Sequence, residues 1–264
     1  MIRFLGDLAN WFAHHWSGDA GYLNRTWELV AVSAAAMAMA IVLALPMAAW
    51  LAHRGKGGLL AVSLVNIGRA LPSFGIVALA LPFTIRLARS GAIPFVESGL
   101  GFLPTFVALF ALALPPIFTN THAGIRAVDP EVVEAARGTG MSGYRVLTSV
   151  ELPLAGPVIL EGIRYTAVQV VATAPLGALV AFGGLGRYIV DGFAALDEVQ
   201  IVAGAILVAV LAVATGRFVA WAGWRLLHPP LRPARRAGTL APLPTVVAVG
   251  RDRVALRERT NREE

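Results

Sequence analysis

The stretch EAARGTGMSGYRVLTSVELP, residues 134–153, decides between two interpretations of this chain. Its centre, GTGMSG, matches the G-x-G-x-x-G pattern of dinucleotide-binding loops, which requires a preceding strand and a helix opening on the third glycine. Here DPEVVEAAR precedes the glycines, and Asp129 followed by Pro130 is typical of a helix start. A second near-match, GGLGRY at 183–188, lacks the final glycine. Both contexts argue against a nucleotide site and favour, in the first stretch, a helix followed by a glycine elbow.

The two glycines after this helix set the direction of the chain that follows. Gly138 and Gly140 are expected to end the helix, because glycine lets the backbone reverse sharply. We expect Ser142 to cap a second short helix running to Val150, and Leu152–Pro153 to turn the chain back into an apolar segment. From the residues alone, the loop fits an ordinary connector as well as a surface that docks a partner.

The composition indicates a membrane protein. Of 264 residues, 57% are hydrophobic and 14% are charged, with a mean hydropathy of +0.69. Soluble domains carry roughly 25% charged residues, and one of this length could not hide so much apolar surface. The chain has no cysteine, which excludes disulfides, zinc–thiolate sites and cysteine nucleophiles.

The net charge of +6 comes almost entirely from the C-terminal tail. Residues 225–264 hold nine arginines and four acids, while the rest of the chain is nearly balanced. A basic tail beside a hydrophobic chain is typical of the cytoplasmic side of a membrane, which we prefer to a nucleic-acid partner.

Five segments are long and apolar enough to cross a bilayer as helices of about 20 residues. The second is interrupted by Arg69, and Pro72 should kink it. An alternative splits this segment at Pro72 and gives six spans. The sequence thus predicts an all-α, polytopic transmembrane helix bundle. The expected spans are Leu29–Ala52, Gly57–Ile85, Ser98–Thr121, Tyr165–Gly186 and Val199–Gly216, the last continuing as FVAWAGW.

Positive charge in short loops gives the orientation. With five spans, HRGKGG (53–58), the arginine-bearing segment 122–164 and the tail all lie on one side, which places the N-terminus outside and the C-terminus in the cytoplasm. Arg86 and Arg89 fall on the opposite side and are the main evidence against this topology. Six spans would separate the tail from the first basic loop, so we prefer five.

Polar side chains at membrane depth call for an explanation because they are costly there. Two sets share one helical face each, at i, i+3 and i+7 spacing. They are candidates for a hydrated translocation path, but hydrogen bonds between helices use the same residue types and are the preferred interpretation. The sets are Asn66, Arg69 and Ser73 in the second span, and Thr166, Gln169 and Thr173 in the fourth.

Other chemistry finds little support in the sequence. Glu161 and Arg164, at i and i+3, are expected to pair at the mouth of the fourth span. The histidines show no metal-ligand spacing apart from the adjacent His14 and His15, so no metal site is predicted. There is no Ser-His-Asp set or carboxylate pair within one polar region, which disfavours an intramembrane enzyme. A channel or membrane scaffold is the remaining class other than a transporter.

The opening stretch carries a more specific resemblance. Its spacing resembles the signature loop of ABC importer permeases. That loop has E-A-A, then three residues, a glycine, nine residues, an aliphatic residue, one residue and L-P. Here the aliphatic residue is valine, where the family usually has isoleucine. The flanks LPPIFTNTHAGIRAVDPEVVEAARGTGMS and GGLGRYIVDGF look like its glycine betaine/carnitine/choline branch. The resemblance covers roughly residues 20–226. The matching positions are Glu134, Ala135, Ala136, Gly140, Val150, Leu152 and Pro153.

The resemblance implies a permease of the bacterial cytoplasmic (inner) membrane and its partners. Two permease copies, identical or related, would form the path, and each loop would dock into an ABC ATPase subunit that binds ATP and Mg²⁺. An extracytoplasmic substrate-binding protein would deliver the solute. This chain lacks the G-x-x-x-x-G-K-[ST] phosphate loop, so no cofactor and no enzymatic activity are expected of it.

The span and charge patterns set the expected domains, and the resemblance sets the expected solute. We expect an N-terminal interfacial segment (1–25), a permease domain (26–226) with its signature loop (129–153), and an Arg-rich, disordered cytoplasmic tail (227–264). The solutes would be glycine betaine, carnitine or choline, with methionine or taurine as the alternative. Cation–π recognition of such ions needs aromatic faces, but the tryptophans stand at the span ends. Selectivity is therefore expected to reside in the binding protein. These tryptophans are Trp11, Trp16, Trp27, Trp50, Trp221 and Trp224.

Overall fold

The computed structural model describes residues 2–18, 21–61, 63–64, 73–90 and 99–226, and these residues form helices and their connections, without a strand. The expected all-α fold is confirmed. In chain order the main elements are α1 (Ile2–His14), α2 (Tyr22–His53), α4 (Ser73–Arg89), α5 (Phe102–Arg126), α6 (Pro130–Gly138), α7 (Gly143–Val146), a π-helical segment (Leu147–Glu151), α8 (Leu152–Thr173), a 3₁₀ segment (Ala174–Val180), α9 (Gly186–Ala195) and α10 (Glu198–Leu226).

Four helical stretches in the described part are long and apolar enough to cross a membrane. They are Tyr22–His53, Phe102–Arg126, Gly143–Val180 and Glu198–Arg225. The expected second span, Gly57–Ile85, lies partly outside the described residues, and its C-terminal part from Ser73 belongs to α4, which continues to Arg89. The number of spans therefore stays a prediction.

The third of these stretches corrects one expected boundary. The sequence predicted a span beginning at Tyr165, but α8 begins at Leu152 and is continuous with the helical turns before it. Glu161 and Arg164 interrupt the apolar pattern without interrupting the helix. They form the expected i, i+3 ion pair at 3.2 Å on an exposed face of α8. Charges paired on an exposed face leave the backbone hydrogen bonds of a helix intact.

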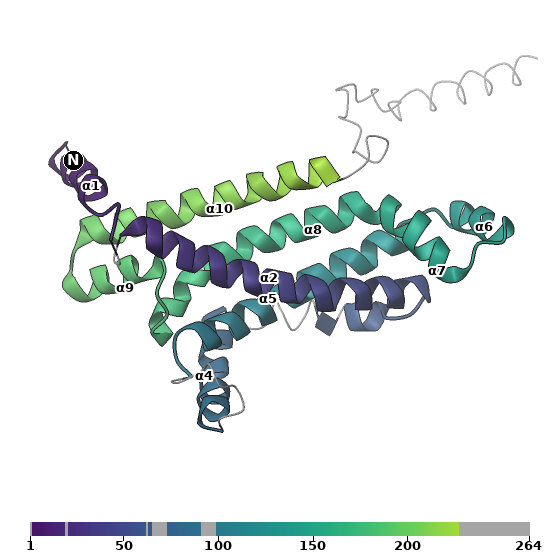
Figure 1. The fold of residues 1–264 in the computed structure, drawn as a ribbon, viewed down its shortest axis with the longest axis horizontal. Helices are drawn as coiled ribbons and strands as arrows, with labels where there is room; N and C mark the ends of the chain where they lie inside the picture. The colour runs from purple at the N-terminus through teal and green to yellow at the C-terminus, as the bar shows by residue number, and fades with distance from the viewer. Residues whose placement is uncertain (1, 19–20, 62, 65–72, 91–98, 227–264) are drawn as a thin grey trace, which may run out of the picture. The chain divides into compact units, whose positions relative to one another are not determined.

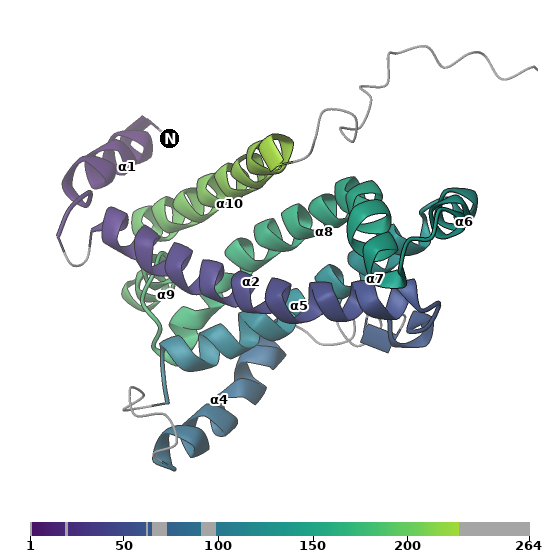
Figure 2. The same ribbon diagram turned by 45° about the vertical axis from the view of Figure 1, so that its right-hand side comes forward.

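The core is built on close packing between α2 and α5. The buried stripe of α2 consists of alanines spaced four residues apart, which places them on one face of the helix. Small side chains allow two helices to approach closely, the usual basis of helix association in membranes. Figures 1 and 2 show α2 running along α5. The stripe consists of Ala36, Ala40, Ala44, Ala48 and Ala52, and it packs with Leu109, Ile117, Phe118 and Ile125 of α5.

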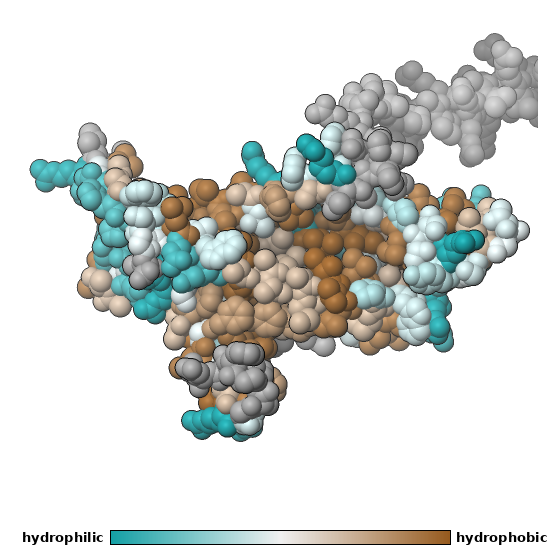
Figure 3. Space-filling view, in the orientation of Figure 1, coloured by the Kyte–Doolittle hydropathy of each residue, from teal (hydrophilic) through white to brown (hydrophobic). Residues whose placement is uncertain are grey.

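The outward surface of the helices is apolar. Figure 3 shows hydrophobic residues across the middle of the visible face and hydrophilic residues toward its two ends. Val42 and Met47 of α2 and Val210 and Phe218 of α10 are each at least half exposed. An apolar band between two polar ends is the surface that a bilayer requires.

Hydroxyl groups inside the apolar helices bond to their own backbone. Thr26, Thr105, Thr166 and Thr215 each donate to the carbonyl oxygen four residues earlier, at 2.6–2.8 Å. A hydroxyl at membrane depth must find a partner, and this local bond supplies one without a second helix.

Contacts at the two ends of the bundle fix the direction of the helices. The ring Nε2 of His122, near the end of α5, bonds to the carbonyl of Lys56, just after α2. At the other end, the Gly101 N–H donates to the Val180 carbonyl. The chain thus leaves α2 beside the C-terminal end of α5 and enters α5 at the opposite end. One end carries α6 and α7, and the other carries α1 and α9 (Figure 1).

Candidate functional site

The predicted helix of the signature loop is α6, and its start follows from local capping. The side-chain oxygen of Asp129 accepts a hydrogen bond from the Glu131 N–H at 2.9 Å, and Pro130 occupies the first turn, where no N–H is needed. No residue of α6 is buried, and Val132 is 43% exposed. The helix therefore presents an open surface, with apolar and charged side chains, at one end of the bundle (Figure 2).

The glycine elbow after α6 is confirmed. The helix ends at Gly138, Thr139 forms the C-cap, and Gly140 has φ +85°. This left-handed conformation is strained for other residues, above all for β-branched ones. Apart from the adjacent residues, no atom of the described chain lies within 4 Å of where a Cβ of Gly140 would stand. Glycine is thus required for the backbone and not for space, and GTGMSG follows a helix, unlike a dinucleotide loop.

The return from the elbow differs from the expectation. Ser142 occupies the N-cap position of α7, but its side chain makes no capping hydrogen bond. The short helix α7 ends at Val146, and the chain continues through the π-helical segment into α8. The predicted turn at Leu152–Pro153 is wrong, because Leu152 has helical angles and Pro153 lies in the first turn of α8. A proline at that position is compatible with a helix.

The signature residues fall into two groups. Glu134, Ala135 and Gly140 are exposed, whereas Ala136, Val150, Leu152 and Pro153 are half-buried. The fold brings the groups together, since α6 packs against α7 and the π-helical segment. The exposed surface of α6 is thereby attached to the π-helical segment, which is continuous with α8 of the bundle.

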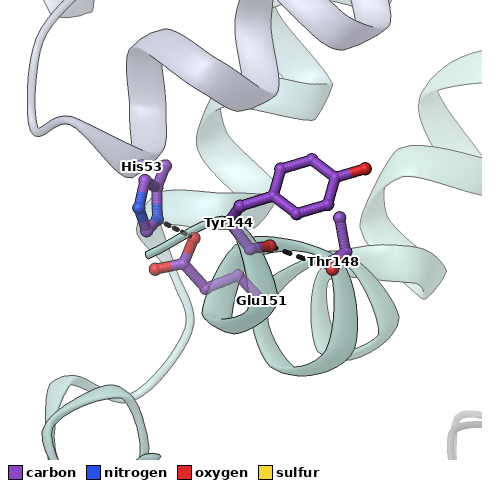
Figure 4. A network of polar contacts seen from close by, with 4 residues as sticks. All are labelled: His53, Tyr144, Thr148 and Glu151. Carbon is purple, nitrogen blue, oxygen red and sulfur yellow. Dashed lines mark hydrogen bonds and ion pairs between the residues drawn. The ribbon is translucent and has the colours of Figure 1, made fainter. Parts of the chain in front are cut away.

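A contact that the sequence did not predict joins the end of α2 to the end of the π-helical segment (Figure 4). Nδ1 of His53, the last residue of α2, donates to Oε2 of Glu151 at 2.7 Å. Glu151 closes the π-helical segment and is buried. The one signal in the sequence is the position of Glu151, an acid directly before an apolar segment.

A hollow of about 370 Å³ adjoins His53. The Arg54 guanidinium lies 3.9 Å from the centre of the Trp50 ring, and the Tyr144 side chain is 79% exposed. The hollow lies between the end of α2 and α7, and it is lined by Trp50, His53, Arg54, Gly143, Tyr144 and Leu147.

The proposed path residues are only partly described. Asn66 and Arg69 lie outside the described residues, and Ser73 is the first residue of α4, with its side chain outside them. The path assignment of this set therefore stays a prediction.

The second set lies along α8. Thr166 is fully buried, and its hydroxyl donates to the Gly162 carbonyl at 2.7 Å. Gln169 and Thr173 are half-buried farther along the same helix. The local bond of Thr166 fits the structural interpretation of this face, and the path assignment of the set stays a prediction.

The second glycine-rich stretch has a packing explanation. The Gly184 N–H donates to the Glu28 carboxylate of α2 at 2.6 Å, and Gly184 has φ +74°. A Cβ at Gly183 would overlap the same carboxylate, and one at Gly186 would overlap the Pro175 carbonyl. These glycines allow close approach to neighbouring groups, so a phosphate need not be invoked.

The histidines of the described part bond within the protein. The rings of His14 and His15 bond to the carbonyls of Asn10 and Trp11, four residues earlier. No group of three metal-binding side chains occurs among the residues that the structure describes.

Comparisons with known proteins agree with this geometry. The chain is 33% identical to the carnitine transport permease protein OpuCB of Listeria monocytogenes, over 82% of this chain and 93% of the relative. It is 34% identical to the choline transport system permease protein OpuBB of Bacillus subtilis, over 72% and 82%. The osmoprotectant import permease protein OsmW of Salmonella typhimurium is 29% identical, over 76% and 89%.

A solved structure shows the same fold. Inward-facing MetNI, a methionine ABC transporter, matches with a TM-score of 0.62 at 22% identity, over 76% of this chain and 92% of that one. The family of binding-protein-dependent transport system inner membrane components matches residues 31–232. The chain therefore belongs to that family of membrane transport components.

Proposed function

We propose that this chain is the permease subunit of an ATP-driven importer for osmoprotectants of the glycine betaine, carnitine and choline class. The observation that carries the proposal is the exposed α6, held by the Gly140 elbow on a segment bonded to the end of α2. This arrangement suits a surface that receives force from a partner. The curated relatives named for carnitine, choline and osmoprotectants support the solute class.

The partners follow from the same proposal. An ABC ATPase subunit docks on α6 and hydrolyses ATP, a second permease copy or a paralogue completes the path, and an extracytoplasmic binding protein supplies the solute. The chain itself holds no cofactor and catalyses no reaction. Methionine or taurine is the alternative solute.

The domain assignment is also part of the proposal. Residues 26–226 form the permease domain, and 129–153 its docking loop. In the first 25 residues α1 carries Trp11, which is buried against Tyr188 with ring centres 5.0 Å apart. This contact fits a short helix lying at the outer interface. The arginine-rich residues 227–264 form a cytoplasmic tail outside the described residues.

Uptake by the assembled system tests the solute class. Cells without osmoprotectant uptake, given this chain with its ATPase and binding protein, should accumulate labelled glycine betaine. Omitting the ATPase should abolish accumulation, because import against a gradient needs ATP. Uptake of methionine or taurine instead would support the alternative solutes, and passive conduction without the ATPase would indicate a channel.

Single cysteines test the topology, because the chain has none of its own. With five spans, cysteines at Ser17 and Ser98 should react with an impermeant reagent in intact cells, and one at Thr239 should react only after lysis. The direction of α2 and α5 supports an odd number of crossings between them. Protection of Ser98 or labelling of Thr239 in intact cells would contradict the model.

A further inference from the structure

The bond between His53 and Glu151 joins parts of the chain that lie 98 positions apart. Their side chains are 15% and 6% exposed, so water hardly competes for the 2.7 Å contact. His53 is the last residue of α2, so its contact ends on the C-terminal turn of that helix. The acceptor, Glu151, ends the π-helical segment, and such segments frequently occur at functional sites.

The same imidazole ring also lies near Gly143, the first residue of α7 in the docking loop. A Cβ on Gly143, the first residue of α7, would stand 3.3 Å from His53 Nε2. The ring thus lies against Gly143 with one nitrogen and bonds Glu151 with the other. The last residue of α2 therefore bonds the end of the π-helical segment and lies close to the start of α7.

This position matters because of how α6 is mounted. With no buried residue of its own, α6 reaches the bundle through its neighbours, α7 and the π-helical segment. A displacement of α6 can be transmitted along the backbone into α8. Through His53 it can also be transmitted to α2, which packs along α5 and α8. The His122–Lys56 bond joins the turn after α2 to α5. A displacement of the C-terminal end of α2 is therefore also transmitted to α5.

We propose that His53 and Glu151 form a coupling clasp, two positioning residues that carry the movement of the docking loop into α2. The inference rests on the proposed function, since a partner ATPase supplies the movement. Without the clasp, α6 still binds the ATPase, but its displacement is absorbed between α7 and α2 instead of moving the bundle.

The deciding variant replaces both partners by leucine, H53L/E151L. Removing one partner of a buried pair leaves the other charge uncompensated, whereas replacing both by apolar residues is often neutral or stabilising. A merely structural pair would therefore tolerate this change. We expect the double variant to fold and bind the ATPase but to import about tenfold less glycine betaine per ATP hydrolysed, a typical coupling effect.

Two companions complete the experiment. Exchange of the partners, H53E/E151H, should restore at least part of the import per ATP because the bond is remade. E161Q removes the exposed Glu161–Arg164 pair on α8 and should leave the ratio unchanged. If H53L/E151L does not fold, E151Q keeps the shape of the side chain, weakens the bond and should lower the ratio in the same direction.

A measurement without transport separates the clasp from the proposed function. Lys56 and Ser149 are both exposed, and spin labels on cysteines at these positions report the distance between the end of α2 and the docking loop. The parent should show a narrow distance distribution, H53L/E151L a broad one and the exchanged pair a narrow one. A parent that imports no glycine betaine contradicts the proposed function only. A parent that imports, with parent-like ratios and distances in the variants, overturns the clasp.

Discussion

Replacing Gly140 by valine should abolish ATP-dependent import while leaving the protein in the membrane. Gly140 has φ +85°, a conformation that costs a β-branched residue about 1–3 kcal/mol. The chain relieves this strain by reorienting α6, which no buried contact of its own holds in place. A docking surface presented at the wrong angle loses its central contacts. We expect uptake to fall at least about thirtyfold, corresponding to about 2 kcal/mol, the threshold for an interface hot spot.

Asparagine is the matched control at this position. It is about as large as valine but tolerates the left-handed conformation, so Gly140→Asn should retain most of the uptake. Because no atom beyond the adjacent residues lies within 4 Å of a Cβ here in the described chain, a difference between the two variants reports the backbone and not the added bulk.

The face of α6 itself is tested by Ala135→Arg. Ala135 is exposed, so arginine fits the isolated chain, but it would prevent close approach of the ATPase. Ala9→Arg, at an exposed position of α1, is the control. The ATPase should co-purify with the control and not with Ala135→Arg. Normal transport by both Gly140→Val and Ala135→Arg would contradict the docking assignment.

The loop could be predicted because its determinants are local. An Asx cap with a following proline specifies a helix start, and a glycine supplies the left-handed residue at its end. Asp129, Pro130 and Gly140 do this in the structure. The apolar helices were predictable for a similar reason, because length and hydropathy alone define a span.

The remaining features depend on contacts between distant residues. Nothing near His53 in the sequence indicates that it meets Glu151, since the pairing follows from where α2 ends against the π-helical segment. The predicted start of the fourth span, at Tyr165, was wrong because Glu161 and Arg164 look like the boundary of an apolar segment. Their i, i+3 spacing predicted the pair, but only the structure shows that it lies on an exposed face of a continuous helix.

Substrate selectivity should reside in the separate binding protein. A quaternary ammonium ion needs aromatic faces, and several such faces are already covered by the chain's own cations. Arg54 lies over Trp50, Arg225 over Trp221 and Arg25 over Tyr188. Trp16, Trp27 and Trp224 are exposed near helix ends, as expected for rings at the membrane interface.

The phenylalanines of α5 offer a weaker alternative. Phe102, Phe106 and Phe110 stack along the helix with ring centres 5.9 and 6.3 Å apart, so their faces partly cover one another. Phenylalanine is also a poorer cation–π partner than tryptophan. We therefore expect the permease with its ATPase, but without the binding protein, to bind labelled glycine betaine no better than about millimolar, the weak end of specific binding.

Exchange of the binding protein completes this test. A related binding protein of different specificity, able to dock on the same permease, should change which solute is imported, because the path only has to admit what is delivered. The parent binding protein with the same competing solutes is the control, and ATP hydrolysis stimulated by each binding protein shows that it docks. Micromolar binding of glycine betaine by the permease and ATPase alone would contradict this division of labour. So would a solute preference that stays with the permease after a docking-competent exchange, and the stacked phenylalanines of α5 would then be the first residues to replace.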